Sequence, residues 1–502
     1  MDQKASAKVL VLDFGAQYGQ LIARRVRDLN VYSEIVPCDI SSDEIRDMNA
    51  SALILSGGPA SVYAEDAPSI DPAIFDLGLP VLGFCYGHQI TAVTLGGKVG
   101  HSEVGEYGRA TITRTAGAKL FNSTPMEQTV WMSHRDAVSE VPEGFTVTAS
   151  TEVCPVASME YPERRLFATQ FHPEVRHTEF GQTMLRNFLF GVCELEPDWT
   201  MDSIIDDSVE AIRAEVGDDR VILGLSGGVD SSVVAALCAK AIGKQLTCVF
   251  INHGLLRKGE PEQVEEVFTK QFDVDFIHVH AEDRYAELLA GVTEAEEKRR
   301  IIGTQFWKEF FAVAQQLETD GKPVKYLAQG TIYPDILESD GVKAHHNVGG
   351  LPDDLQFELC EPVKLLYKDE VRVIGRELGI PEGMVERQPF PGPGLGVRCL
   401  GAITRDRLEA LREADVVCAE DTRVTGKLLA HFGIEKRLAR LDEAMIGSRA
   451  AGVVERVAAG EKPVCVEACP ARALDFGTVE EISKVGERGN IAPLPEPHYT
   501  NP

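Results

Sequence analysis

The chain has 502 residues, 44% of them hydrophobic, and a formal net charge of −28 at pH 7, so about two to four domains with apolar cores are expected. This negative charge argues against a nucleic-acid-binding surface, because affinity for a phosphate backbone requires a positive one, although a local site could hold a small nucleotide. The sequence shows neither a signal peptide nor the run of about 20 apolar residues that a membrane span needs, so we expect a cytoplasmic protein with reduced thiols.

The N-terminal part of the chain alternates short apolar runs with helical patterns. Lys8–Asp13, Ala52–Leu55 and Val81–Phe84 are expected to be buried strands, and 17–29 is expected to be a helix. Strands that alternate with helices predict an α/β domain with a largely parallel sheet. The pattern breaks at 194–199, Glu-Leu-Glu-Pro-Asp-Trp, which we interpret as a linker.

A second α/β unit follows this linker. We expect strands at 220–225 and 246–251, with a glycine turn at 227–230 and a helix over 231–242 between them. Pro-Phe-Pro-Gly-Pro at 389–393 is a strong break and predicts the end of the unit. The predicted fold class is therefore α/β, with two doubly wound domains.

Cys85 stands in Gly-Phe-Cys-Tyr-Gly-His-Gln (83–89), between an expected strand and an expected helix. This position lifts the thiol out of the sheet, near the positive end of a helix, where the thiolate is favoured. Gly83 and Gly87 permit the tight turn. The pattern is typical of a hydrolase nucleophile elbow with sulfur in place of oxygen.

A thiol nucleophile requires a base and a group that orients the base. His172 and Glu174 are two residues apart in an extended stretch, so they would point to the same side and could fill these roles. The amides of Gly58, in a Ser-Gly-Gly-Pro loop, and of Tyr86 could stabilise an oxyanion. The alternative is a buried structural cysteine and an unrelated surface histidine, but the combination of motifs favours catalysis.

These residues resemble the class I glutamine amidotransferase family over most of 8–190. The resemblance implies that Cys85 forms a glutamyl thioester and releases ammonia, with His172 as the base and Glu174 as its orienting partner. The substrate glutamine would lie beside three further residues: Gln89, Ser133 and His134.

A second motif, Leu-Ser-Gly-Gly-Val-Asp-Ser-Ser (225–232), lies between an expected strand and an expected helix. Successive amides in such a turn form an anion site at a helix N-terminus, and Asp230 could reach phosphates through Mg²⁺. No Gly-Lys-Ser/Thr ending is present, so the motif is not a Walker A loop, and a generic glycine turn is the alternative. The motif resembles the pyrophosphate loop of the N-type (adenine-nucleotide alpha-hydrolase-like) ATP pyrophosphatases, which implies adenylylation of a substrate by ATP. The implied ATP-binding residues are Ser226, Gly227, Gly228, Val229, Asp230, Ser231, Ser232 and Lys364.

Three further segments resemble the GMP synthase family rather than NAD synthetase and other relatives of this loop. They are Leu-Ala-Gln-Gly-Thr-Ile-Tyr-Pro-Asp (327–335), His-His-Asn-Val-Gly-Gly-Leu-Pro (345–352) and Glu-Pro-Val-Lys (361–364). The resemblance implies that a lid with His345, His346 and Asn347 closes over XMP. Lys364 and Lys368 could stabilise a leaving polyphosphate, although alone they would indicate a solvated helix face.

The resemblance implies that XMP, ATP, glutamine and water give GMP, AMP, pyrophosphate and glutamate, with Mg²⁺ as cofactor. An amidotransferase domain at 8–198 would free ammonia, and a synthetase domain at 199–398 would adenylylate XMP. Ammonia is mostly protonated at neutral pH, so a fused glutaminase would deliver it unprotonated. The family's homodimer depends on a third domain, of which 399–415 would be the start.

The resemblance ends near residue 412, and the tail at 416–502 departs from the family. Its first part resembles a fragment of a 16S rRNA 2′-O-ribose methyltransferase, and its last part resembles a dimethyl sulfoxide reductase-type iron–sulfur subunit. Cys465 and Cys469 supply two of the four thiolates that a cubane cluster takes, so no iron–sulfur cluster is expected.

We interpret the tail as a truncated or foreign C-terminal segment at a chimeric junction; a divergent dimerisation domain is the alternative. Two hypotheses follow for the whole chain. It is an active GMP synthase, or it is a remnant that hydrolyses glutamine or binds nucleotide but cannot complete GMP synthesis, because the dimerisation and XMP-phosphate module is missing.

Overall fold

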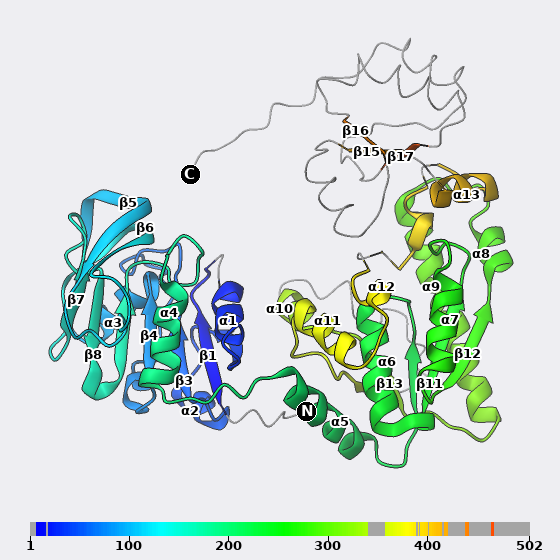
Figure 1. Ribbon diagram of the computed structural model, residues 1–502, viewed down its shortest axis with the longest axis horizontal. Helices are drawn as coiled ribbons and strands as arrows, with labels where there is room; N and C mark the ends of the chain where they lie inside the picture. The colour runs from blue at the N-terminus through cyan, green and yellow to red at the C-terminus, as the bar shows by residue number, and fades with distance from the viewer. Residues whose placement is uncertain are drawn as a thin grey trace, which may run out of the picture. The chain divides into compact units, whose positions relative to one another are not determined.

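The computed structural model divides into two units, Met1–Asp207 and Ser208–Pro502 (Figure 1). The residues that the structure describes are 7–16, 19–339, 357–387, 390, 392–399, 401–413, 416–419, 437–440 and 463–465. Among these residues, no helix is both long enough and apolar enough to cross a membrane.

A nine-stranded sheet forms the centre of the first unit, in the order β2-β1-β3-β4-β9-β8-β7-β5-β6. Its strands are β1 (Lys8–Asp13), β2 (Tyr32–Pro37), β3 (Ala52–Leu55), β4 (Val81–Phe84), β5 (Lys98–Arg114), β6 (Glu127–Glu140), β7 (Thr146–Ser150), β8 (Ser158–Tyr161) and β9 (Leu166–Thr169). Neighbours from β2 to β9 pair in parallel, and the strands beyond β9 pair antiparallel. The predicted parallel-rich α/β sheet is confirmed, and the antiparallel extension is an addition to it.

Helices cover both faces of the parallel part of this sheet. They are α1 (Gly19–Arg27), α2 (Ser42–Asp47), α3 (Tyr86–Thr94) and α4 (Gly181–Arg186), with short turns at Pro72–Asp76, Pro162–Arg164 and Asn187–Val192. Alternate residues of β1 point to opposite faces. Val9 and Val11 join a core with α1 and α4, whereas Leu10 and Leu12 join a core with α2 and α3. This two-sided cover is the predicted doubly wound arrangement.

The second unit contains a five-stranded sheet in the order β12-β11-β10-β13-β14, and all its neighbouring strands are parallel. The strands are β10 (Val221–Gly224), β11 (Leu246–Asn252), β12 (Asp275–His280), β13 (Tyr326–Ala328) and β14 (Glu358–Cys360). The helices and short turns are α5 (Met201–Val216, which begins in the first unit), α6 (Val229–Ile242), α7 (Glu260–Lys270), α8 (Glu282–Leu288), α9 (Ala295–Thr319), α10 (Tyr333–Ser339), α11 (Lys368–Glu377), α12 (Glu382–Val385), α13 (Arg405–Glu413), Gly243–Gln245 and Gly394–Gly396.

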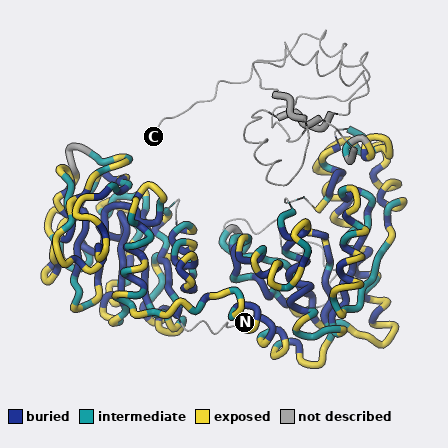
Figure 2. Tube along the Cα trace, in the orientation of Figure 1, coloured by how far each residue is buried: buried dark blue, intermediate teal, exposed yellow. Residues whose placement is uncertain are grey.

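The sheet of the second unit is buried between helices on its two faces (Figure 2). Ile222 and Val249 point into a core with α8 and α9. On the other side α6 packs against α11, where a Cβ added at Gly375 would lie 3.0 Å from Val233 Cγ2. The sheet therefore presents the carboxyl ends of its parallel strands at one edge, which is where ligands bind in such folds.

Three short strands are described in the tail. β15 (Val416–Ala419), β16 (Arg437–Arg440) and β17 (Pro463–Cys465) form a parallel sheet in the order β16-β15-β17. Cys469 and most of the tail lie outside the described residues. The interpretation of the tail as a foreign segment stays a prediction.

Candidate active site

Cys85 lies at the turn between β4 and α3 in a strained backbone conformation. Its φ of 50° and ψ of −100° fall in a region that non-glycine residues rarely adopt. The Cys85 amide donates a hydrogen bond of 2.8 Å to the carbonyl of Thr169, at the end of the neighbouring β9. Strain of this kind persists only where the surrounding structure enforces it, and it is concentrated at functional sites.

Glycines on both sides of Cys85 allow the turn to close. A Cβ at Gly83 would lie 2.5 Å from the carbonyl oxygen of Gly87, and a Cβ at Gly87 would lie 2.4 Å from that of Leu55. Real Cβ atoms do not approach backbone oxygens so closely, so neither position accepts a side chain without a backbone shift. The elbow is thus packed directly onto β3.

His172 and Glu174 form a buried pair just after β9. His172 Nδ1 lies 2.7 Å from Glu174 Oε1, and the two side chains are 9% and 1% exposed. The segment is anchored by the His172 amide, which donates to the carbonyl of Trp131 at 3.0 Å, and by Arg25 Nε, which donates to the carbonyl of Glu174 at 2.9 Å. Because β9 pairs with β4, this segment begins beside the cysteine elbow.

The electrostatics of the pair favour a protonated imidazole. Burial lowers the pKa of His172, but the Glu174 carboxylate and the hydrogen bond with Cys85 outweigh it and hold the pKa well above 6.5. A Cβ placed on Gly57 would lie 3.1 Å from His172 Cε1 and 3.5 Å from Cys85 Cβ, so the two side chains meet over this glycine. An imidazolium here can stabilise a thiolate on Cys85.

The two backbone amides that were predicted to be oxyanion donors, those of Gly58 and Tyr86, belong to neighbouring residues at the elbow. Tyr86 is the first residue of α3, so its amide has no acceptor within the helix. The amide of Gly58 makes no hydrogen bond within the described part of the chain. A Cβ at Gly58 would lie 3.4 Å from Tyr86 Cγ, which places the two residues side by side.

The three residues expected beside glutamine are placed differently from one another. The Ser133 carbonyl accepts a hydrogen bond of 3.6 Å from Cys85 Sγ. Gln89 is buried, and its Nε2 donates to the carbonyl of Asp136 at 2.7 Å. The His134 ring is 1% exposed and faces Glu106 Oε2 at 3.1 Å. Burial lowers the pKa of His134 although Glu106 opposes this effect.

Gln170 contacts the cysteine and was not singled out from the sequence. Its Nε2 lies 3.7 Å from Cys85 Sγ, and its Oε1 accepts from Gln89 Nε2 at 3.3 Å. Gln170 stands two residues before His172, in the bend that follows β9. Its contact with Cys85 follows from the pairing of β9 with β4, and no local signal in the sequence predicts it.

The serine–glycine motif forms a loop between β10 and α6, with Gly228 as the cap of the helix and Gly227 at a φ of 75°. The hydroxyls of Ser226 and Ser231 hydrogen-bond each other at 3.0 Å, and Ser232 Oγ donates to the Gly228 carbonyl at 2.8 Å. These bonds brace the loop from within. The amides of the first turn of α6, which begins at Val229, have no acceptor within the helix and can bind an anion.

Asp230 and Lys368 form an ion pair beside the loop. The pair uses Asp230 Oδ2, whereas Oδ1 is buried without a hydrogen-bond partner among the described residues. A carboxylate oxygen in this situation suits a hard cation such as Mg²⁺. Lys364 is half-buried and precedes α11 by a few residues.

Arg387 joins the loop from far along the chain. Its Nη1 donates to the Gly227 carbonyl at 2.9 Å and lies 2.8 Å from Glu260 Oε1. The Arg387 side chain is 11% exposed and that of Glu260 is 4% exposed. The sequence placed Arg387 only at the start of a proline-rich break, so its contact with the loop was not predicted.

Residues that follow β13 also reach the loop. β10 and β13 are parallel neighbours, so the segments after them emerge at the same sheet edge. A Cβ at Gly330 would lie 3.1 Å from Asp230 Cβ. Thr331 Oγ1 donates to Glu361 Oε1 at 2.6 Å, which joins two of the three segments that favoured one family. The expected lid residues His345, His346 and Asn347 lie outside the described residues.

Comparison with known proteins identifies two family models in the order of the two sites. Glutamine amidotransferase class-I matches residues 10–192, and NAD synthase matches residues 202–304. The first match contains the cysteine elbow, and the second contains the serine–glycine loop.

Three curated relatives that match most of the chain carry the name GMP synthase (glutamine-hydrolyzing). The protein of Clostridium acetobutylicum is 52% identical over 435 residues, which are 86% of this chain and 83% of that protein. The protein of Streptomyces coelicolor is 54% identical over 426 residues, 83% of this chain and 81% of that protein. The protein of Staphylococcus carnosus is 51% identical over 456 residues, 90% of this chain and 86% of that protein. Such identity over more than two thirds of each relative is decisive, and the chain belongs to the glutamine-hydrolysing GMP synthase family.

Proposed function

We propose that this chain aminates XMP to GMP, using ATP and ammonia that it frees from glutamine. The observation that carries the proposal is the meeting of Cys85 and His172 over Gly57, with Glu174 bound to the far side of the imidazole, in a chain about half identical to GMP synthases. An amidotransferase domain at 8–198 and a synthetase domain at 199–398 would divide the two half-reactions.

In the glutaminase half, the Cys85 thiolate attacks the side-chain amide carbon of glutamine. The amides of Gly58 and Tyr86 stabilise the oxyanion, and His172 gives its proton to the departing ammonia. Glu174 holds the imidazolium in place. Water, deprotonated by His172, then hydrolyses the thioester and releases glutamate. Gln170 Nε2 can donate to the thiolate, the Ser133 carbonyl accepts from the thiol form of Cys85, and Gln89 and His134 support the glutamine pocket.

In the synthetase half, the loop from Ser226 to Ser232 binds the β- and γ-phosphates of ATP through backbone amides and hydroxyls. An oxygen of XMP attacks the α-phosphorus, and pyrophosphate departs. Ammonia then displaces AMP from the adenylylated base. Lys364 and Lys368 neutralise the leaving pyrophosphate. Asp230 would hold Mg²⁺, which adds positive charge at the phosphates when bound.

The substitution Cys85→Ala tests the division of labour. We expect glutamine-dependent GMP formation to fall by at least about 10³-fold, while synthesis with ammonium salt is unchanged, because only the source of nitrogen is lost. Cys38→Ala, at a half-buried cysteine of the same unit, is the matched control. Glutamine hydrolysis that survives Cys85→Ala would contradict the proposed nucleophile.

A second candidate function is a remnant that hydrolyses glutamine and binds ATP but does not complete GMP synthesis. It rests on the interpretation of the tail at 416–502 as a foreign segment that replaces the family's dimerisation domain. Against it, the match to the Staphylococcus carnosus protein covers 90% of this chain and therefore extends into the tail. The same assay distinguishes the two candidates. Glutaminase activity that depends on Cys85, without GMP formation from either glutamine or ammonium, identifies the remnant.

A further inference from the structure

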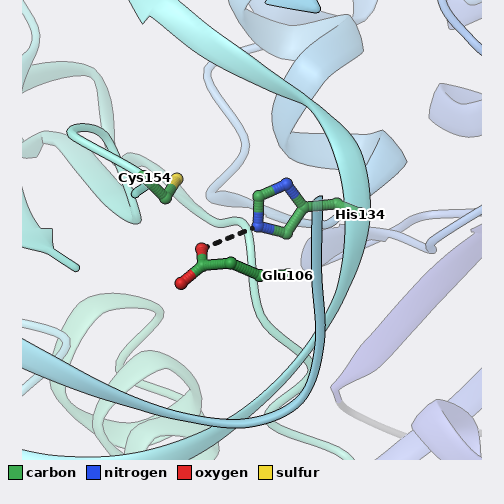
Figure 3. A group of neighbouring side chains, drawn as sticks. All are labelled: Glu106, His134 and Cys154. Atoms are coloured by element: carbon green, nitrogen blue, oxygen red, sulfur yellow. Dashed lines mark hydrogen bonds and ion pairs between the residues drawn. The ribbon is translucent and has the colours of Figure 1, made fainter. Parts of the chain in front are cut away.

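Glu106, His134 and Cys154 form a cluster in the antiparallel part of the first sheet (Figure 3). Glu106 on β5 and His134 on β6 are direct cross-strand partners, next to a register shift in the hairpin. Cys154 comes from the loop between β7 and β8. One ligand atom from each residue lies within 4.8 Å of the other two. The proposed mechanism of glutamine hydrolysis assigns no role to Glu106 or Cys154.

Hydrogen bonds around the cluster fix the orientation of its side chains. His134 Nδ1 lies 3.2 Å from the Asp136 carbonyl, which only accepts, so a proton on Nδ1 gives this pair a hydrogen bond. Thr151 Oγ1 donates to Glu106 Oε1 at 2.9 Å and accepts from the Cys154 amide at 2.8 Å. Metal-binding histidines and carboxylates are held in this way by groups behind them.

The same bonds create a conflict between His134 and Glu106. With the proton on Nδ1, a neutral imidazole turns the lone pair of Nε2 toward Glu106 Oε2, which is 3.1 Å away. Two acceptors at this distance repel unless a proton or a cation lies between them. A second imidazole proton, a proton on the Glu106 carboxyl or a metal cation can fill this place.

We propose that this cluster is a binding site for a divalent transition-metal ion of the zinc class, held by His134 Nε2, Glu106 Oε2 and Cys154 Sγ. Imidazole nitrogen, carboxylate oxygen and thiolate sulfur are the three ligand types that Zn²⁺ takes in proteins. The Cys154 thiol gives its proton to solvent when its sulfur binds. Water completes the fourth position, as in zinc sites with three protein ligands.

Binding of a metal ion requires the ligand atoms of the cluster to move closer together. Tetrahedral zinc with bonds of about 2.0–2.3 Å holds its ligands about 3.3–3.8 Å apart. Glu106 Oε2 and His134 Nε2, 3.1 Å apart, are already close enough. The contraction of about 1 Å therefore has to bring Cys154 Sγ, which lies within 4.8 Å of the other two ligand atoms, closer to them. His134 is fixed from behind, so the side chains of Cys154 and of Glu106, which is 14% exposed, provide this movement. The proposal concerns binding and does not depend on the proposed function.

Metal titration of the full chain tests the site. The Cys85→Ala background removes the active-site thiol, which could otherwise bind the probe. After treatment with a chelator, we expect one equivalent of Zn²⁺ to bind, and Co²⁺ to give the charge-transfer absorption of a cobalt–thiolate bond. Adding Cys154→Ser should abolish this absorption and weaken zinc binding at least tenfold. Adding Cys38→Ser should change neither.

Glu106→Gln supplies a second test at a less buried position. It should weaken zinc binding at least tenfold while the cobalt–thiolate absorption persists at saturating Co²⁺, since Cys154 remains a ligand. If Cys154→Ser does not fold, as judged by thermal unfolding, Glu106→Gln decides the matter. The proposal is overturned if the Cys85→Ala protein binds no zinc at micromolar free metal, or if both cluster variants bind it as tightly as Cys38→Ser.

Discussion

At the scale of single residues, the His172–Glu174 pair shows how one buried carboxylate sets both the orientation and the charge of a base. Glu174 Oε1 holds Nδ1 at 2.7 Å, and Glu174 Oε2 is buried without a hydrogen-bond partner among the described residues. The hydrogen bond to His172 is therefore the only one that the Glu174 side chain makes among the described residues. The opposite ring nitrogen is left to face the cysteine.

Glu174→Gln should lower the rate of glutamine hydrolysis by about 10²–10⁴-fold, because the imidazolium loses its partner while the fold keeps a side chain of the same size. GMP formation with ammonium salt should not change. Steady-state assays with the two nitrogen sources measure both effects. Equal loss with glutamine and with ammonium would indicate a structural defect instead.

The raised pKa of His172 also predicts a pH dependence of stability. The folded-state pKa lies above 6.5, so the stabilising effect is fully present below pH 6.5 and is lost as the pH rises through the folded-state value. The difference in Tm between the wild type and Glu174→Gln should therefore be largest below pH 6.5 and shrink at alkaline pH. A difference that is constant across this range would contradict the assignment of the charge to His172.

At the scale of elements, the turn from β4 to α3 depends on backbone contacts that glycine alone permits. Gly87 lies against β3, where a Cβ would stand 2.4 Å from the Leu55 carbonyl oxygen and 2.7 Å from Leu55 Cβ. Contact with β3 thus fixes the position of Cys85 relative to the sheet. The packing of Gly87 against Leu55 determines both the backbone of the turn and the place of the Cys85 side chain.

Gly87→Ala should destabilise the first unit by about 3 kcal/mol, since overpacking against backbone cannot be relieved by a rotamer change. Glutamine hydrolysis should be lost together with the elbow geometry. Thermal or urea unfolding measures the first effect. Gly191→Ala, where a Cβ would meet nothing within 4 Å, should leave both stability and hydrolysis near the wild-type values.

The serine–glycine loop is likewise held by an element distant in sequence. Arg387 neutralises the buried Glu260 carboxylate and binds the Gly227 carbonyl. Arg387→Ala should raise the KM for ATP at least about tenfold, because an unpaired buried carboxylate would then face the phosphates. Glutaminase activity should not change. Arg376→Ala, at an exposed arginine of α11 with its own acidic partners, is the matched control, and an equal effect of both variants would refute a local role.

At the scale of the whole molecule, the family match covers 83–90% of this chain in the three relatives compared. The three tail strands form a sheet separate from the two larger ones. If the tail replaces the family's dimerisation domain, the XMP phosphate site and the dimer are both affected. The two active centres described above are built from residues before 388 and do not use tail residues.

Replacing 416–502 with the corresponding C-terminal part of a relative should therefore increase GMP formation with ammonium salt and lower the KM for XMP. The glutaminase rate should change little. Steady-state kinetics and size-exclusion chromatography measure activity and dimer formation. A natural chain that already dimerises and turns over XMP as fast as the exchanged one would show that the tail is a divergent form of the family's own domain.

The sequence by itself determined the two α/β folds and the placement of Cys85 at an elbow, because strand, turn and helix signals are local. A loop between β10 and α6 could be recognised for the same reason. The hydrogen bond between His172 and Glu174 was predicted, although the segment is a turn and not the extended stretch from which the contact was argued.

The tertiary structure alone decided which distant residues meet these local motifs. Gln170 contacts a sulfur 85 positions away, and Arg387 contacts a carbonyl 160 positions away. Glu106 faces His134 through the register of a long hairpin. Such contacts depend on strand order, register and helix packing, which are set by burial of the whole core and leave no periodic signal in the neighbouring residues.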